Sequence, residues 1–247
     1  MREKKIIIIL VEPSGPINIG SIARLCKNFG VKELRLVAPK CNPIQEDSIK
    51  MSMNGINILR NHKTFLELID AISDCETIIA TCGRKDHGNI PPLSTLEESI
   101  KYISETNYRG NIALVFGRED RGLTNQELLL ADKVIFLESS NDYNSLNISH
   151  AVAIVLYKIF CSSRIILNKN NIDNELNIAL SKEYEILFNE IEKLLLDIDY
   201  LLKHTASSRM SKLRIFLKRR KMSSEEVNSL RGIVRKLNWN LKNKSKE

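Results

Sequence analysis

Several features that would assign this 247-residue chain to a common class of protein are missing. Its five cysteines include no Cys-x-x-Cys pair, and their odd number and scatter indicate neither a disulfide framework nor a zinc site. No apolar run approaches the roughly 18 residues of a membrane span. The first apolar run, residues 6–11, is too short for a signal peptide, and Glu12 and Pro13 follow it without a cleavage site. We therefore expect a cytoplasmic protein that has no metal centre and no membrane partner.

The common fingerprints of nucleotide-binding enzymes are missing too. The sequence has neither a Gly-x-Gly-x-x-Gly pattern nor a Gly-Lys-Ser/Thr loop, which argues against a conventional dinucleotide or ATP enzyme. The four histidines fall in different expected elements, so each is interpreted as structural.

Basic charge is concentrated near one end of the chain. The formal net charge is +7, but residues 205–247 hold thirteen Lys or Arg against three Glu. That segment therefore carries +10, and the rest of the chain carries −3. A basic appendage on a nearly neutral body predicts a polyanionic partner. The simpler alternative is a solvated, lysine-rich end.

Short β-branched runs alternate with helical patterns over residues 1–167. We expect strands at residues 4–11, 33–38, 77–81, 112–116 and 134–137. Helices are expected at residues 21–29, 47–53, 65–72, 94–103, 125–130 and 148–167, and Ser94 and Glu97 fit a capping box at the fourth of them. This alternation predicts an α/β domain with a mainly parallel sheet and helices on both faces.

A small helical domain is expected beyond a linker. Residues 168–180 are rich in Asn, Lys and Asp, which is typical of a linker. In residues 181–247, apolar positions recur every three or four residues from Tyr184 to Leu202 and from Val227 to Leu241, and Ser223 with Glu226 forms a second capping box. Between these two amphipathic helices we expect a short basic helix with Arg209, Lys212, Arg214, Lys218, Arg219, Arg220 and Lys221.

Three polar loops follow strands and should meet at the carboxyl edge of the sheet, where open α/β sheets bind ligands. The loops are residues 18–24, with Asn18 and Arg24, residues 117–122, with Glu119, and residues 138–149. Buried amides and hydroxyls need hydrogen-bonding partners, so these loops predict a ligand site. The plainer interpretations are a surface arginine, a tight turn with solvated charges, and a strand-to-helix turn with Asn144 or Ser145 as the N-cap.

Three motifs then resemble, in order, those of the SpoU branch of the SPOUT RNA methyltransferases. They are Asn18-x-Gly-x-x-Ala-Arg24 followed by Asn28-Phe-Gly30, then Leu114-Val-Phe-Gly-x-Glu119-x-x-Gly-Leu123, and Ser145-Leu-Asn147 before Ala151. The pattern Met210-x-x-Leu-Arg-x-x-Leu, with Glu226 and Leu230-Arg-Gly-Ile233 after it, resembles the C-terminal segment of the TrmJ subfamily.

The resemblance implies a homodimer with a C-terminal trefoil knot that uses S-adenosylmethionine to methylate the ribose 2′-hydroxyl of nucleotide 32 in the tRNA anticodon loop. It implies no DNA partner. A SpoU enzyme that acts on ribosomal RNA or another tRNA position remains an alternative, as does a non-catalytic RNA-binding protein on the same scaffold. The implied cofactor contacts are Thr81, Cys82, Gly83, Gly117, Leu137, Asn144, Ser145 and Leu146.

The implied catalytic residues are Arg24, Asn18, Glu119, Ser145 and Asn147. A guanidinium with a pKa above about 12 is a poor general base, so we expect Arg24 to grip the RNA phosphate and to stabilise the developing alkoxide. Ser145 would hydrogen-bond the hydroxyl or the cofactor, and Glu119 would hold Arg24 or an RNA group. The two asparagines would order the loop, and the seven basic residues between the last two amphipathic helices would hold the tRNA backbone.

Overall fold

The computed structural model describes residues 5–83, 90–105, 110–139, 146–166 and 177–244. The chain divides into two compact units, Met1–Glu175 and Leu176–Glu247, which we call the α/β unit and the helical unit. In the described ranges, no helix is long and apolar enough to cross a membrane. Most of the expected linker, residues 168–180, lies outside the described residues.

A parallel sheet of seven strands forms the centre of the α/β unit, in the order β3-β2-β1-β6-β4-β7-β5. This arrangement confirms the α/β prediction. The strands are β1 (Lys5–Val11), β2 (Glu33–Val37), β3 (Lys63–Phe65), β4 (Cys75–Cys82), β5 (Leu93–Ser94), β6 (Asn111–Phe116) and β7 (Lys133–Phe136). The two edge strands β3 and β5 were not predicted, because segments of two or three residues carry no periodicity.

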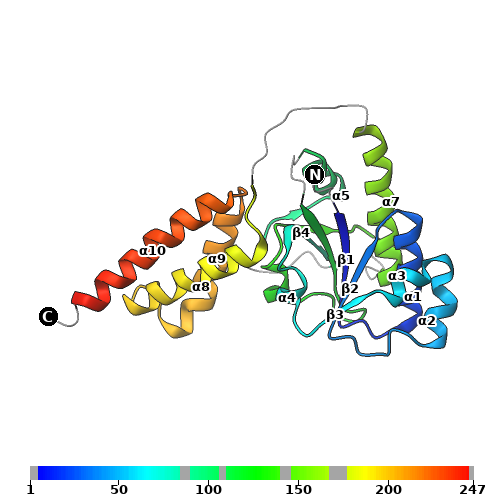
Figure 1. Ribbon diagram of the computed structural model, residues 1–247, viewed down its shortest axis with the longest axis horizontal. Helices are drawn as coiled ribbons and strands as arrows, with labels where there is room; N and C mark the ends of the chain where they lie inside the picture. The colour runs from blue at the N-terminus through cyan, green and yellow to red at the C-terminus, as the bar shows by residue number, and fades with distance from the viewer. Residues whose placement is uncertain (1–4, 84–89, 106–109, 140–145, 167–176, 245–247) are drawn as a thin grey trace. The chain divides into compact units, whose positions relative to one another are not determined.

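The sheet is covered on both faces, as its apolar strands predicted. Alternate side chains of β1 enter different cores: Ile8 and Leu10 pack in one, and Ile7 and Ile9 in the other. The first core also contains residues of α1 (Pro16–Asn28), α3 (Ile56–Arg60), α5 (Leu96–Glu105) and α7 (Ile148–Ile166), and Figure 1 shows α1 and α7 on one side of the sheet. The second core contains residues of α4 (Leu68–Ala71) and α6 (Asn125–Leu128). The remaining helices of the unit are α2 (Glu46–Ser52) and the 3₁₀ turn η1 (Met53–Gly55).

Three helix starts differ from the sequence-based expectation. Helix α1 begins at Pro16 rather than residue 21, because proline suits the first helical turn. The helix expected at residues 65–72 is strand β3 followed by the single turn α4. The capping box of α5 uses Thr95 and Glu98, not Ser94 and Glu97, because Ser94 belongs to β5.

The helical unit consists of α8 (Ser181–Asp197), α9 (Lys203–Lys218) and α10 (Ser224–Lys244) around its own apolar core. The predicted capping box at α10 is confirmed: Glu226 N donates to Ser223 Oγ at 3.1 Å, and Ser223 N donates to Glu226 Oε2 at 2.7 Å. Helix α10 is also tied to α8 by an ion pair between Arg231 and Glu190 at 3.0 Å.

Candidate active site

A cavity of about 380 Å³ opens at the carboxyl ends of β4, β6 and β7. Its walls include six residues that the sequence analysis expected to contact a cofactor: Thr81, Cys82, Gly83, Gly117, Leu137 and Leu146. The other two, Asn144 and Ser145, lie outside the described residues. The structure therefore brings together all six of the expected contacts that it describes.

Further lining residues were missed by the sequence analysis. Phe116 ends β6, and Ile148 and Ala151 come from the first turn of α7. The apolar spacing at the start of α7 was a usable signal, since residues three apart share one face of a helix. These side chains, with Leu137 and Leu146, give the cavity an apolar wall in addition to the polar loop at residues 117–122, a combination typical of sites for organic ligands.

Two glycines shape that loop. A Cβ on Gly117 would lie 2.3 Å from the carbonyl carbon of Gly122 and 2.4 Å from the nitrogen of Leu123. Gly122 has a φ of +69°, a left-handed conformation that glycine adopts without strain. Arg118 and Gly122 close the turn by exchanging backbone hydrogen bonds of 3.3 and 3.0 Å. The turn is tight because both positions lack a side chain, and it carries Glu119 between them.

Side-chain amides connect the three polar loops in one chain of hydrogen bonds, which we call the amide relay. Asn147 Nδ2 donates to Asn18 Oδ1 at 3.1 Å, and Asn18 Nδ2 donates to Glu119 Oε1 at 3.1 Å. Residues 129 and 101 positions apart in sequence therefore meet through Asn18, in the first turn of α1.

The direction of the amide relay is determined at both ends. An ionised carboxylate only accepts hydrogen bonds, so the NH₂ group of Asn18 must face Glu119. At the other end, Asn147 Oδ1 accepts from Ser149 N at 2.8 Å, which leaves its NH₂ group for Asn18. Asn147 is thus the N-cap of α7, so the plainer interpretation of this segment, with Asn144 or Ser145 as the N-cap, is wrong.

Glu119 is held as an anion at the start of α1. Its carboxylate also accepts hydrogen bonds from the hydroxyl of Ser14 at 3.1 Å and from the backbone nitrogen of Gly15 at 3.3 Å. Burial raises the pKa of Glu119, but the hydrogen bonds from Asn18 and from the backbone of Ser14 and Gly15 outweigh it and lower the pKa overall. The carboxylate therefore stays charged at neutral pH and fastens the loop at residues 117–122 to α1.

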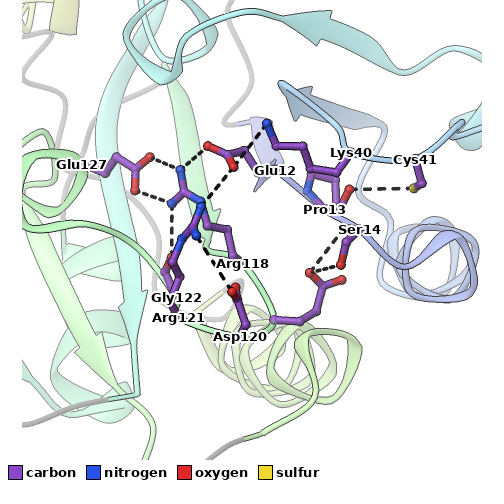
Figure 2. A network of polar contacts seen from close by, with 11 residues as sticks. Glu12, Pro13, Ser14, Lys40, Cys41, Arg118, Asp120, Arg121, Gly122 and Glu127 are labelled. Atoms are coloured by element: carbon purple, nitrogen blue, oxygen red, sulfur yellow. Dashed lines mark hydrogen bonds and ion pairs between the residues drawn. The ribbon is translucent and has the colours of Figure 1, made fainter.

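Arg118, in the same loop, forms ion pairs with Glu12 and Glu127 (Figure 2). Its guanidinium donates to both oxygens of Glu127 at 2.9 and 3.0 Å and to Glu12 at 2.5 Å, and its side chain is only 9% exposed. Hydrogen bonding from Arg118 lowers the pKa of Glu12 to about 2 against the opposing effect of burial. The charges of Arg118 and Glu119 are therefore paired or hydrogen-bonded and partly buried, whereas Asp120 and Arg121 of the same turn are exposed. Arg118 and Glu12 were missed because no local pattern predicts an ion pair across 106 residues.

Arg24 does not join the amide relay. It is an exposed residue of α1 that does not line the cavity, and no hydrogen bond or ion pair reaches it from another described residue. Six residues of helix turn it about 120° around the axis from Asn18. The expected contact between Glu119 and Arg24 is not made, because the Glu119 carboxylate is engaged by Asn18, Ser14 and Gly15. Ser145 lies outside the described residues.

The seven basic residues expected to bind RNA separate into two groups. Arg209, Lys212, Arg219 and Arg220 are exposed, and Lys221 is half-buried. Arg214 instead forms an ion pair of 2.6 Å with buried Glu185 and lies 4.5 Å from the ring centre of Phe188. Lys218 is 8% exposed and lies over the ring of Tyr184. Arg214 and Lys218 therefore pack within the helical unit, and the other five of the seven basic residues are the more accessible ones.

The chain is similar to known proteins along both units. Residues 5–157 match the SpoU rRNA Methylase family, and residues 182–247 match the C-terminal domain of tRNA methyltransferase TrmJ. One relative is the tRNA (cytidine-2′-O-)-methyltransferase TrmJ of Methanocaldococcus jannaschii, which is 37% identical over 74% of this chain and 79% of its own length. Another is the tRNA (cytidine/uridine/adenosine-2′-O-)-methyltransferase TrmJ of Pseudomonas aeruginosa, which is 31% identical over 93% of this chain and 92% of its own.

The architecture is similar to a solved structure as well. The crystal structure of TrmJ from Z. mobilis ZM4 superposes with a TM-score of 0.81 at 28% identity, covering 94% of this chain and 98% of that one. The glycine turn at residues 117–122 and the amide relay both lie within the segment matched by the family model. This chain belongs to the SpoU methylase family and carries a C-terminal domain of the TrmJ type.

Proposed function

We propose that this chain transfers the methyl group of S-adenosylmethionine to a ribose 2′-hydroxyl in tRNA, at nucleotide 32 of the anticodon loop. The observation that carries the proposal is the amide relay beside the cavity, because it joins all three SpoU motifs at one edge of the sheet. The names of the relatives, which are tRNA 2′-O-methyltransferases, support tRNA as the substrate.

The cavity fits the proposed cofactor in size and chemistry. Its volume of about 380 Å³ falls within the range of small-molecule sites, and its apolar wall suits an adenine ring. The backbone at residues 81–83 and 117–122 supplies hydrogen-bonding groups to the same cavity. When bound, S-adenosylmethionine supplies an activated methyl group, so the protein needs no nucleophile of its own.

The task of the chain is to orient the ribose and to accommodate the charge left as the hydroxyl loses its proton. The amide relay, anchored by Glu119, holds the loops rigid around the cavity. Arg24 grips an RNA phosphate and stabilises the negative charge on the 2′-oxygen. Because Arg24 is exposed and does not line the cavity, this role requires the target ribose to lie between Arg24 and the cavity mouth.

We also propose that the protein is a homodimer. Helices α1 and α7 pack against each other through Phe29 and Tyr157, whose ring centres are 6.4 Å apart. They leave Ile17, Ile154 and Tyr157 exposed by 51, 42 and 60%. Two neighbouring helices that present apolar side chains favour self-association. Sedimentation of the wild type beside a Tyr157→Glu variant tests this: the variant should be a monomer, and an unchanged sedimentation coefficient would contradict the interface.

A trefoil knot is part of the same proposal. Strand β7 pairs with β4 on one side and β5 on the other, so a late strand is inserted between two earlier ones. Leu137, directly after β7, and Leu146, shortly before α7, both line the cavity. Together these placements support a knot at the cofactor site.

The test is to incubate the purified chain with radiolabelled S-adenosylmethionine and either tRNA transcripts or ribosomal RNA, and then to map the modified nucleotide. We expect 2′-O-methylation of tRNA at nucleotide 32, with at least a hundredfold slower single-turnover methylation by Arg24→Ala at saturating RNA. Lys27→Ala, an exposed cation of the same helix, is the matched control. Methylation of ribosomal RNA alone would favour the alternative substrate, and near-normal turnover by Arg24→Ala would refute its proposed role.

A further inference from the structure

Helix α9 presents two chemically different sides. Ala206 and Met210 are buried in the core of the helical unit, and Arg214 and Lys218 flank them with contacts to α8. Phe216 lies about 200° around the helix from both Arg214 and Lys218, so it points away from that flank. Its side chain is 64% exposed.

Exposed cations surround Phe216. Arg209 lies seven residues before it, or about 20° around the axis, and Lys212 lies four residues before it, or about 40°. Arg219 follows three residues later at the end of α9. All three cations are exposed, and so is Arg220 immediately beyond. An aromatic ring therefore stands in the middle of a basic helical face rather than singly among mixed polar residues.

A second exposed aromatic ring is fixed beside this face. Tyr200 is 62% exposed and belongs to the turn between α8 and α9, in which Asp199 has a φ of 56°. Arg209 Nη1 donates to the carbonyl oxygen of Tyr200 at 3.0 Å, and its guanidinium carbon lies 5.8 Å from the ring centre of Tyr200. Arg209 thus holds Tyr200 in place on the side of α9 that also carries Phe216.

We propose that this surface, defined by Tyr200, Arg209, Lys212, Phe216 and Arg219, binds single-stranded RNA, with Phe216 and Tyr200 stacking on unpaired bases while the cations contact phosphates. Aromatic rings between basic side chains are the combination that single-stranded nucleic acids require. The inference rests on the proposed function in taking RNA as the partner, and it specifies an unpaired stretch of that RNA. Arg209 and Phe216 are separated by roughly 10 Å along the axis, so each ring takes a base of its own.

Two other occupants fit less well. The bases of a duplex are stacked on each other, so a paired stem would contact only the cations and would offer no base for Phe216 to stack on. A second copy of the chain would bring like charge against like, since residues 205–247 carry a net charge of +10. Helix α10 carries Trp239, which is 58% exposed, but also Ile233, 58% exposed, and Leu237, 48% exposed, which are apolar without a ring and so serve as controls.

The experiment measures binding of the full chain to three labelled RNAs: a tRNA transcript, a 12-nucleotide single strand and a 12-base-pair duplex. Phe216→Leu keeps an apolar side chain but removes the ring, Phe216→Trp keeps a stacking surface, and Ile233→Ala is the control on α10. We expect Phe216→Leu to weaken binding of the transcript and the single strand about tenfold, with duplex binding and the salt dependence unchanged. Phe216→Trp should bind all three RNAs at least as tightly as the wild type.

Several outcomes would overturn the inference. Equal losses for Phe216→Leu and Ile233→Ala would make the effect nonspecific, and an equal loss on the duplex would exclude base stacking. A change in oligomeric state with intact RNA affinity would assign the surface to a protein partner. Urea denaturation followed by far-ultraviolet circular dichroism reports whether the helical unit of each variant is folded. Phe216-dependent RNA binding without methyl transfer by the wild type would refute the proposed function and leave this inference standing.

Discussion

The α/β unit and the helical unit use charge in opposite ways. Beside the cavity, Arg118 is paired with Glu12 and Glu127, and the carboxylate of Glu119 is fully occupied by hydrogen bonds. On α9, by contrast, Lys212 and Arg219 project into solvent. A small-ligand site needs a backbone held in one geometry, whereas a polyanion needs only free positive charge on a surface. Substitutions of the paired charges beside the cavity should therefore disturb structure and cofactor binding, and substitutions of the exposed cations on α9 should change only RNA affinity.

The largest effect should come from Gly117→Ala. The new Cβ would meet backbone atoms at 2.3 and 2.4 Å, so the glycine turn must open and the cavity wall must move. We expect S-adenosylmethionine affinity, measured by calorimetry, to fall more than a hundredfold. Gly83→Ala is the matched variant, because it lines the same cavity but its Cβ would meet no atom within 4 Å, and it should cost less than tenfold. Similar losses of affinity for both variants would show that the turn does not depend on the close contact of Gly117 with Gly122 and Leu123.

Arg118→Ala should produce the next largest effect, on stability. It leaves Glu12 and Glu127 without their shared cation in a partly buried position, which should lower the free energy of unfolding by about 3 kcal/mol. Arg121→Ala removes a cation that lies 3.4 Å from the same Glu12 but is 61% exposed, and it should cost less than about 1 kcal/mol. Urea denaturation of both variants tests the contrast, and equal midpoints would contradict it.

The same ion pairs predict a pH dependence. The pKa of Glu12 is about 2 in the folded protein, below its ordinary value of 4.5, so the folded state favours the charged form. The stability that this carboxylate contributes is present above about pH 4.5 and is lost as the pH falls toward 2. Wild type and Glu12→Gln should therefore differ in unfolding free energy at pH 7 and converge as the pH falls from 5 to 3. A difference that stays constant over this range would contradict the linkage.

Breaking the amide relay should have a smaller effect, on turnover. Asn18→Asp keeps the shape of the side chain but places a second carboxylate 3.1 Å from Glu119 and removes the donated hydrogen bond. We expect single-turnover methylation to slow about tenfold or more at saturating cofactor. Asn147→Asp can still cap α7 through Ser149, so its loss should be smaller. A larger loss for Asn147→Asp than for Asn18→Asp would indicate that turnover depends on the N-cap of α7 and not on the hydrogen bond to Glu119.

The smallest effect should follow from neutralising the helical unit. The double variant Arg219→Gln and Arg220→Gln removes two exposed cations without touching the core. We expect tRNA affinity to fall several-fold and the slope of log affinity against log salt to decrease by roughly one to two. Cofactor affinity and the urea midpoint should stay unchanged. Arg214→Gln should instead lower the urea midpoint, because it breaks the ion pair with buried Glu185, and it should leave the salt slope unchanged.

Local patterns were sufficient for most of the fold. The β-branched run of β1 and the apolar spacing of α7 and α10 predicted these elements to within a few residues, because burial on a regular element repeats at a fixed interval. Helix α8 ends at Asp197, five residues before the expected Leu202, because the chain turns at Asp199, which has a φ of 56°. Strand β5 was not predicted, because its two residues are recognisable as a strand only by their pairing with β7. Helix α1 begins five residues before its predicted start, because Pro16 is favourable in the first helical turn.

The sequence alone determined which residue types surround the cavity and where the excess positive charge lies, because both are properties of composition and motif order. Only the tertiary structure decided how these residues are used. Asn147, Asn18 and Glu119 become one hydrogen-bonded chain, and Arg118 becomes a buried brace, through contacts between residues more than a hundred positions apart. On α9, the phase of the helix decided that Lys212 is free while Arg214 is paired. Such distinctions depend on what packs against each side chain, and local sequence does not carry that information.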